Sequence, residues 1–172
     1  GWEPRSVCPM PLVPHLAPGA TPSSAFARRT ATSDDAQNED IRIARILTSV
    51  KTIALVGWSP KADRASNHVA AFLKAKGYRV MPVNPGQAGQ DSGLGEVVRA
   101  SLGEVGPVDM VDIFRRSEEV GPVVDEAIAT GAKVIWMQLG VENVEAAERA
   151  KAAGMEVVMN RCPAIDIPRL GL

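Results

Sequence analysis

At 172 residues and 18.2 kDa, the chain is long enough to fold as one domain with a sizeable core. Its 19 basic and 20 acidic residues nearly cancel, and no basic run is interleaved with aromatic residues, so nucleic-acid binding is not expected. No apolar stretch approaches the roughly 18 residues that a membrane-spanning helix needs. These features predict a soluble protein with no membrane span.

The two cysteines, Cys8 and Cys162, are too few for a disulfide framework. Neither lies in a Cys/His spacing typical of a metal site, so we expect no metal cofactor. This cysteine usage favours a reducing compartment, the cytoplasm. An organelle matrix, reached after removal of a targeting segment, is the alternative.

Residues 1–37 differ from the rest of the chain. They hold six of the 13 prolines and show no helical or strand pattern, so they cannot bury enough apolar surface to fold alone. We interpret them as a proline-rich arm, or as a targeting or linker segment, and residues 38–172 as the folded domain. A proline-rich extended chain loses little backbone entropy on binding, which favours attachment of a protein partner through this arm. The alternative is that the arm packs on the domain's own sheet edge.

From residue 38 onward, segments with helix and strand patterns alternate at short spacing. Asn38 can cap a first helix whose apolar face includes Ile43 and Leu47. The expected strands are residues 52–56, 79–83, 108–114, 133–139 and 155–159. The expected helices between them are residues 67–76, 118–130 and 143–153. This alternation predicts an α/β fold: a Rossmann-like doubly wound parallel sheet of about five strands in a single domain.

The stretch from Thr52 to His68, TIALVGWSPKADRASNH, reads as strand, polar loop and helix. In a doubly wound sheet this first turn binds a phosphate, because backbone N–H groups and the helix dipole favour an anion there. Gly57 is the one glycine of a three-glycine dinucleotide fingerprint that is present. The loop is therefore expected to bind phosphate through side chains, Arg64 above all, as well as through backbone; a plain solvated connection is the alternative.

Ligands of such sheets bind outside the carboxyl ends of the strands. That rule brings five segments to one rim: residues 57–66, 84–87, 114–116, 138–140 and 160–162. Arg115 and Arg116 are candidates for ligand contacts there, or else they neutralise nearby acids. No Ser/His/Asp or Cys/His arrangement and no metal-binding or P-loop motif appears, so the sequence predicts binding without identifiable catalytic machinery.

Six separate blocks of the chain occur in the order of a known family. They are GWSPKADRASNHV, VMPVNPG, SLGEV, VDMVDIFRRSEEV, AIATGAKVIWMQLGV and AAERAKAAGMEVVMNRCPAIDIPRL. Over about residues 41–170 the sequence resembles the small stand-alone coenzyme A (CoA) binding domain proteins, which are similar to the N-terminal domain of succinyl-CoA synthetase alpha subunits. The resemblance implies no ligase activity, since the synthetase's catalytic histidine belongs to a second domain that these blocks do not match.

The resemblance implies CoA or acyl-CoA as the ligand, held by three loops around the nucleotide. The residues so assigned are Gly57, Trp58, Ser59, Arg64, Ser66, Asn84, Gln87, Phe114, Arg115 and Arg116. Two of them depart from the family pattern: Trp58 replaces a small residue, and Gln87 replaces a frequent lysine.

Two alternatives to a CoA-binding protein remain open. In the first, the chain is an accessory subunit of a larger assembly that retains the CoA-binding fold and attaches through its N-terminal arm. In the second, it binds NAD or NADP, which share this type of sheet. Dinucleotide sites normally place an acidic residue at the end of the second strand, where this chain has Asn84.

Overall fold

A computed structural model describes the backbone of residues 24–172 and the side chains from residue 34 onward. Residues 40–172 form one compact unit. The interpretation of residues 1–23 as part of an arm lies outside the described residues. No helix among those described is both long and apolar enough to cross a membrane.

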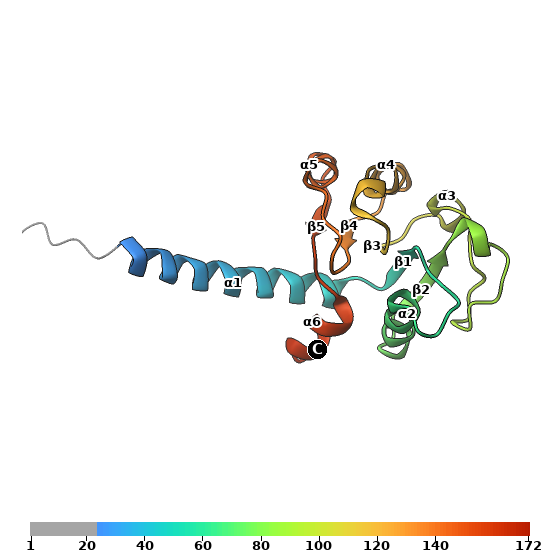
Figure 1. The fold of residues 1–172 in the computed structure, drawn as a ribbon, viewed down its shortest axis with the longest axis horizontal. Coiled ribbons are helices and arrows are strands. Elements are labelled where there is room, and N and C mark those ends of the chain that lie inside the picture. The colour runs from blue at the N-terminus through green and yellow to red at the C-terminus, as the bar shows by residue number, and fades with distance from the viewer. Residues whose placement is uncertain (1–23) are drawn as a thin grey trace, which may run out of the picture. The chain divides into compact units, whose positions relative to one another are not determined.

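Five parallel strands form a single sheet in the order β2-β1-β3-β4-β5 (Figure 1). The strands are β1 (Thr52–Val56), β2 (Arg79–Val83), β3 (Met110–Ile113), β4 (Val134–Met137) and β5 (Glu156–Val158). The predicted α/β fold with a Rossmann-like parallel sheet is confirmed. In particular, β1 and β2 have the predicted bounds, while β3, β4 and β5 are each shorter than predicted.

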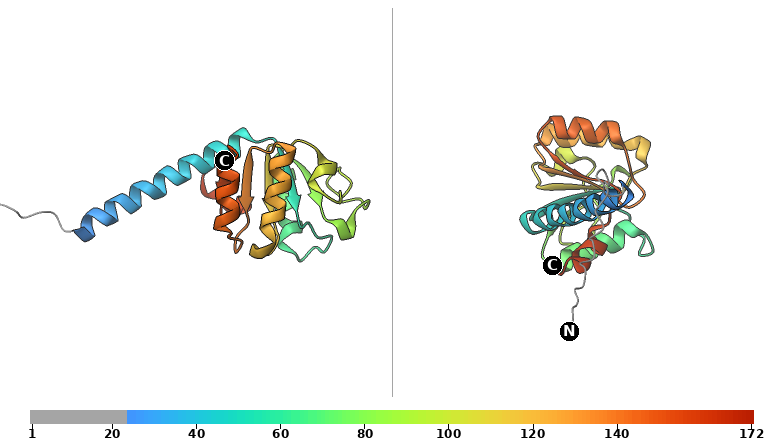
Figure 2. Two further views of the ribbon diagram at one scale, coloured as in Figure 1. Left: turned by 90° about the horizontal axis from the view of Figure 1, so that it is seen from above. Right: turned by 90° about the vertical axis from the view of Figure 1, so that its left-hand side faces the viewer.

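Helices cover both faces of this sheet. They are α1 (Ser24–Ser49), α2 (Ala65–Ala75), α3 (Leu102–Val105), α4 (Val120–Thr130), α5 (Val144–Ala152) and α6 (Pro163–Arg169), with the short 3-10 turns η1 (Pro85–Gln87) and η2 (Ser117–Glu119). One face packs against α2, α6 and residues 43–50 of α1. The other face packs against α3, α4 and α5, so the unit has three layers (Figures 1 and 2).

The start of the first helix and the presence of a short C-terminal helix differ from the prediction. Asn38 does not cap the first helix but lies inside α1, which begins at Ser24. Residues 24–37 are rich in alanine and arginine and contain no proline or glycine, so helix propensity extends the helix toward the N-terminus. Helix α6 was not predicted, because it has only seven residues and contains Pro168, which reads as a helix breaker.

The strands are apolar at almost every position because both faces of the sheet are covered. Successive side chains of β1 point to opposite faces: Ile53 and Leu55 pack with α2 and α6, and Ala54 and Val56 pack with the other layer. All four are buried. This two-sided burial is the reason that the sequence shows short apolar runs rather than alternating ones.

Asp112 is the exception within the core. It lies on β3, in register with Leu55 and Trp136, and its side chain is fully buried. Neither of its carboxylate oxygens has a hydrogen-bond partner among the described residues, and burial raises the pKa of this carboxyl well above its usual value. Asp109 behaves in the opposite way: the backbone N–H groups of Lys51 and Thr52 donate to its carboxylate, at 2.8 and 3.2 Å, and lower its pKa.

The raised pKa of Asp112 and the lowered pKa of Asp109 predict opposite effects of pH on the stability of the folded protein. Asp112 has a higher pKa in the folded than in the unfolded chain, so the folded protein holds its proton and loses stability as pH rises above about 3.9. Asp112→Asn should remove that loss, which amounts to at most about 1.4 kcal/mol per pH unit. Urea unfolding between pH 4 and pH 8, in roughly unit steps, measures it.

Asp109→Asn is the matched control. Its carboxylate has a lowered pKa, so its stabilisation is present above the unfolded pKa and disappears as pH falls. The Asp109 variant should therefore be less stable than the wild type at neutral pH, by about 1 kcal/mol. If Asp112→Asn leaves the pH dependence unchanged, Asp112 does not hold a proton in the folded protein.

Candidate functional site

After the paired strands β1 and β3, the chain leaves the sheet toward opposite faces. β1 leads into α2 on one face, whereas its neighbour β3 leads through η2 into α4 on the other face. Connections that diverge in this way leave a crevice at the carboxyl ends of the two strands. Two cavities, of about 320 and 580 Å³, lie there, and both are lined by Gly57 and Phe114.

Gly57 is required by the geometry of this crevice. It has φ of +93°, and its N–H donates to the Val83 carbonyl at 2.8 Å. A Cβ on this residue would lie 2.5 Å from the carbonyl oxygen of Phe114. The loop after β1 can pass this close to the end of β3 only because residue 57 has no side chain.

The loop between β1 and α2 forms the first cavity. Ser59, Lys61, Arg64, Ala65 and Ser66 line it together with Gly57 and Phe114. The Ser66 hydroxyl accepts a hydrogen bond from the Ser59 N–H at 3.0 Å, and the Asn67 amide donates to the Ser59 carbonyl at 2.9 Å. The loop is thus folded back onto the first turn of α2.

Ser66 belongs to a residue type that often caps helices, and from its place before the predicted helix 67–76 it could cap that helix, but it does not cap α2. Arg64 occupies the N-cap position with an extended backbone, and no described side chain caps the helix. Ser66 lies within the first turn and directs its hydroxyl to the loop instead, because the loop returns close enough to compete for it. The amino end of α2, with its partial positive charge, therefore faces the first cavity without a side-chain cap.

Two cations stand at this amino end. Lys61 and Arg64 are both exposed, and neither has an ion-pair partner among the described residues. Arg64 was predicted as a phosphate donor, and Lys61 was not singled out although it belongs to the same polar loop. Both side chains can bind an anion in the cavity without giving up an existing partner.

The second cavity contains the paired arginines after β3. Arg115, Arg116, Asn84, Glu118 and Glu119 line it together with Gly57 and Phe114. Arg115 binds Glu119 at 2.6 Å, and Arg116 approaches the other oxygen of Glu119 at 3.9 Å. Neutralisation of a nearby acid, the alternative reading of these arginines, thus holds for Glu119. Arg116 keeps 80% of its side chain exposed and remains available to a ligand.

A third, more apolar cavity of about 370 Å³ adjoins the second. The two share Arg115, Glu118 and Glu119. Its apolar wall consists of Val56, Val83, Pro85, Pro122 and Val123. Sequence reasoning missed this cavity, because its walls come from β1, β2, η1 and α4 and no local pattern brings them together.

The remaining predicted site residues, Trp58, Asn84 and Gln87, have different positions. Trp58 is 2% exposed and packs in the core beneath α2, so it lines none of these three cavities and does not crowd the turn. The Asn84 amide donates to the Trp58 carbonyl at 2.7 Å and its oxygen accepts from the Gly86 N–H, which ties two loops together. Gln87 ends η1 outside the three cavities. Ligand contacts by Trp58 and Gln87 stay predictions.

Comparison with known protein families shows to which family this chain belongs. Residues 51–168 match the family described as CoA binding domain, and they include every loop of the crevice. The chain belongs to this CoA-binding domain family. Within the curated proteins, the uncharacterized protein YneT of Bacillus subtilis (strain 168) is 41% identical over 121 residues, covering 70% of this chain and 87% of YneT.

Solved structures of similar sequence share the fold of this chain. A protein from Thermus thermophilus is 34% identical, with a TM-score of 0.73, over 76% of this chain and 98% of that one. A hypothetical protein from Pyrococcus horikoshii OT3 is 38% identical, with a TM-score of 0.71, over 77% and 92% of the two chains. The resemblance stated from the sequence is therefore confirmed.

Gly57→Ala should destabilise this CoA-binding domain strongly. The new Cβ would combine a left-handed backbone with a clash against the Phe114 carbonyl, and we expect a loss of roughly 3 kcal/mol. Gly131→Ala is the matched control: its φ is +82°, but nothing lies within 4 Å of an added Cβ, so only about 1 to 2 kcal/mol of backbone strain applies. Equal losses in chemical unfolding would show that the Phe114 contact has no energetic weight.

Proposed function

We propose that the crevice between β1 and β3 binds CoA or an acyl-CoA, with the diphosphate in the first cavity. The observation that carries this proposal is the pair of unpaired cations, Lys61 and Arg64, at the uncapped amino end of α2. A diphosphate placed there would meet two positive side chains and the helix dipole together. Membership of the CoA-binding domain family supports the same ligand.

The other two cavities suit the rest of the nucleotide. CoA differs from most dinucleotides in carrying an additional phosphate on the ribose of its adenosine. Arg116, largely exposed in the second cavity, is placed to bind that phosphate, while Arg115 stays paired with Glu119. The adjoining apolar cavity, with Pro85 and Val123 in its wall, offers a surface for the adenine ring.

One feature disfavours NAD, and a second disfavours both NAD and NADP. The residue that follows β2 is Asn84 rather than an acid, and its amide and carbonyl already bind the Trp58 carbonyl and the Gly86 N–H. It is therefore poorly suited to bind the two ribose hydroxyls of NAD. The loop after β1 also lacks the second and third glycines of a dinucleotide fingerprint.

Arg64→Ala should weaken CoA binding about tenfold or more, because a hydrogen bond to a charged partner contributes roughly 1.5 to 3 kcal/mol. Titration calorimetry with CoA, NAD and NADP measures this. The control is Arg79→Ala, which removes the same charge at the amino end of β2, the opposite edge of the sheet, where Arg79 binds Glu96. Absence of CoA binding at millimolar ligand, or tighter binding of NAD, would sink the proposal.

The accessory-subunit alternative concerns residues 1–37, and we propose that a protein partner binds there. The compact unit begins at Asp40, whose carboxylate binds Arg169 at 2.8 and 2.9 Å. Deleting residues 1–37 should therefore leave the thermal midpoint and the CoA affinity nearly unchanged while abolishing co-purification of the partner. Unfolding of the truncated protein would instead make this segment part of the core.

A further inference from the structure

The second cavity of the crevice has as many acids as cations in its lining. Arg115 and Arg116 line it, and so do Glu118 and Glu119. The first cavity differs, because its lining contains two cations and no acid. An anion is therefore attracted to the first cavity without opposition, whereas in the second cavity the acids compete with it for the arginines.

Glu119 is the acid that binds the arginines. Its Oε1 accepts a hydrogen bond from Arg115 Nη2 at 2.6 Å, and its Oε2 lies 3.9 Å from Arg116 Nε. The first contact is a charge-assisted hydrogen bond, whereas the second is too long for a hydrogen bond. Arg115 keeps 37% of its side chain exposed and Arg116 keeps 80%. Glu119 therefore binds Arg115 much more closely than Arg116.

The backbone places Glu119 beside these arginines. Glu119 is the last residue of η2, and its N–H donates to the Arg116 carbonyl at 2.8 Å. Ser117 anchors the turn: its hydroxyl accepts from the Glu142 N–H at 3.0 Å, and its carbonyl accepts from the Asn143 amide at 2.9 Å. Glu119 also occupies the N-cap position of α4, but its side chain does not cap that helix. Its carboxylate is directed to the arginines instead.

Glu118 lines the same cavity without taking part in this pairing. Its side chain is exposed, and its carboxylate has no hydrogen-bond or ion-pair partner in the part of the chain that the structure describes. The two acids are neighbours in the sequence and carry the same charge. They differ in that only Glu119 binds an arginine of this cavity.

We propose that Glu119 withholds Arg115 from the ligand and so limits how strongly the site recognises the ribose phosphate of CoA. This inference rests on the proposed function, in which Arg116 binds that phosphate. Arg115 lines the same cavity, but a phosphate can bind it only in competition with Glu119. That competition is unfavourable, because an internal carboxylate has a high effective concentration at its partner.

The place of Glu119 distinguishes withholding from orienting. A carboxylate that merely orients an arginine toward a ligand binds it from the side away from the ligand. Glu119 instead lines the cavity that the phosphate would enter, with 39% of its side chain exposed. Its negative charge therefore repels an incoming phosphate in addition to holding Arg115.

Dephospho-CoA separates the second cavity from the first. It shares the diphosphate and the adenine ring with CoA and lacks only the phosphate on the ribose. The ratio of the two affinities therefore reports the ribose phosphate alone, because the contribution of the diphosphate cancels. Releasing Arg115 would give that phosphate a second charge-assisted donor beside Arg116. The charge on residue 119 thus determines the specificity for a phosphorylated ribose.

The test is titration calorimetry of the full chain with CoA and with dephospho-CoA, in the wild type and in Glu119→Gln. Glutamine keeps the size of the side chain and removes its charge. The preference for CoA over dephospho-CoA should rise about tenfold or more in this variant, because the phosphate gains a charged hydrogen bond. Glu118→Gln is the matched control. It removes the same charge from the same cavity without releasing an arginine, so it should raise the preference much less.

The double variant Glu119→Gln with Arg115→Gln identifies the arginine that is released, and it should lose the gain. If both ligands bind but Glu119→Gln leaves the preference unchanged or lowers it, Glu119 does not withhold Arg115 and the inference fails alone. An equal rise with Glu118→Gln, or a gain that persists in the double variant, would also overturn it. If neither ligand binds the wild type, the proposed function fails as well.

Discussion

The close approach of Gly57 to the carbonyl of Phe114 is the constraint on which the site depends. It lets the loop after β1 cross the end of β3 while the chain departs from these strands toward opposite faces. Two cavities consequently share this glycine and Phe114 as their common wall. The cations of the β1–α2 loop and the arginines after β3 converge on one crevice because residue 57 occupies so little space.

The parts of the fold that could be predicted from the sequence are those set by local patterns. β1 has the predicted bounds because a buried parallel strand reads as a short apolar run. Asn143, the first residue of the predicted helix 143–153, is a typical capping residue and caps α5, with its side chain accepting from the Ala146 N–H at 2.9 Å. The start of α1 and the existence of α6 could not be read in this way. Both depend on weak helix propensities of the local sequence. In α6 the internal Pro168 also makes the segment look unsuited to a helix.

The candidate site was predictable to the level of loops but not of side chains. The rule that ligands bind at the carboxyl ends of parallel strands selected the correct edge of the sheet. It could not reveal that Ser66 bonds to Ser59, that Trp58 is buried in the core, or that both arginines after β3 share Glu119. The positions of these side chains depend on which residues a loop contacts after the chain has folded. The local sequence around each residue does not show those contacts.

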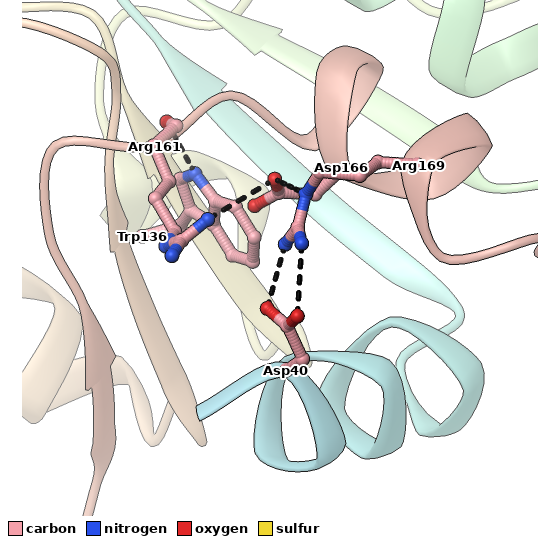
Figure 3. Close-up of polar contacts among 5 residues, drawn as sticks. All are labelled: Asp40, Trp136, Arg161, Asp166 and Arg169. Carbon is pink, nitrogen blue, oxygen red and sulfur yellow. Dashed lines mark hydrogen bonds and ion pairs between the residues drawn. The ribbon is translucent and has the colours of Figure 1, made fainter. Parts of the chain in front are cut away.

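Arg169 connects α6 to a distant part of the chain. Its guanidinium binds Asp166 through Nε and Asp40 through both terminal nitrogens (Figure 3). Asp40 lies on α1, 129 residues earlier, where the buried Ile43 and Leu47 lock the rotation of the helix about its axis. A one-residue insertion between Asp40 and Ile43 would turn Asp40 by about 100° relative to that apolar face. The rotation of α1 about its axis therefore decides whether Arg169 can bind Asp40 and Asp166 at the same time.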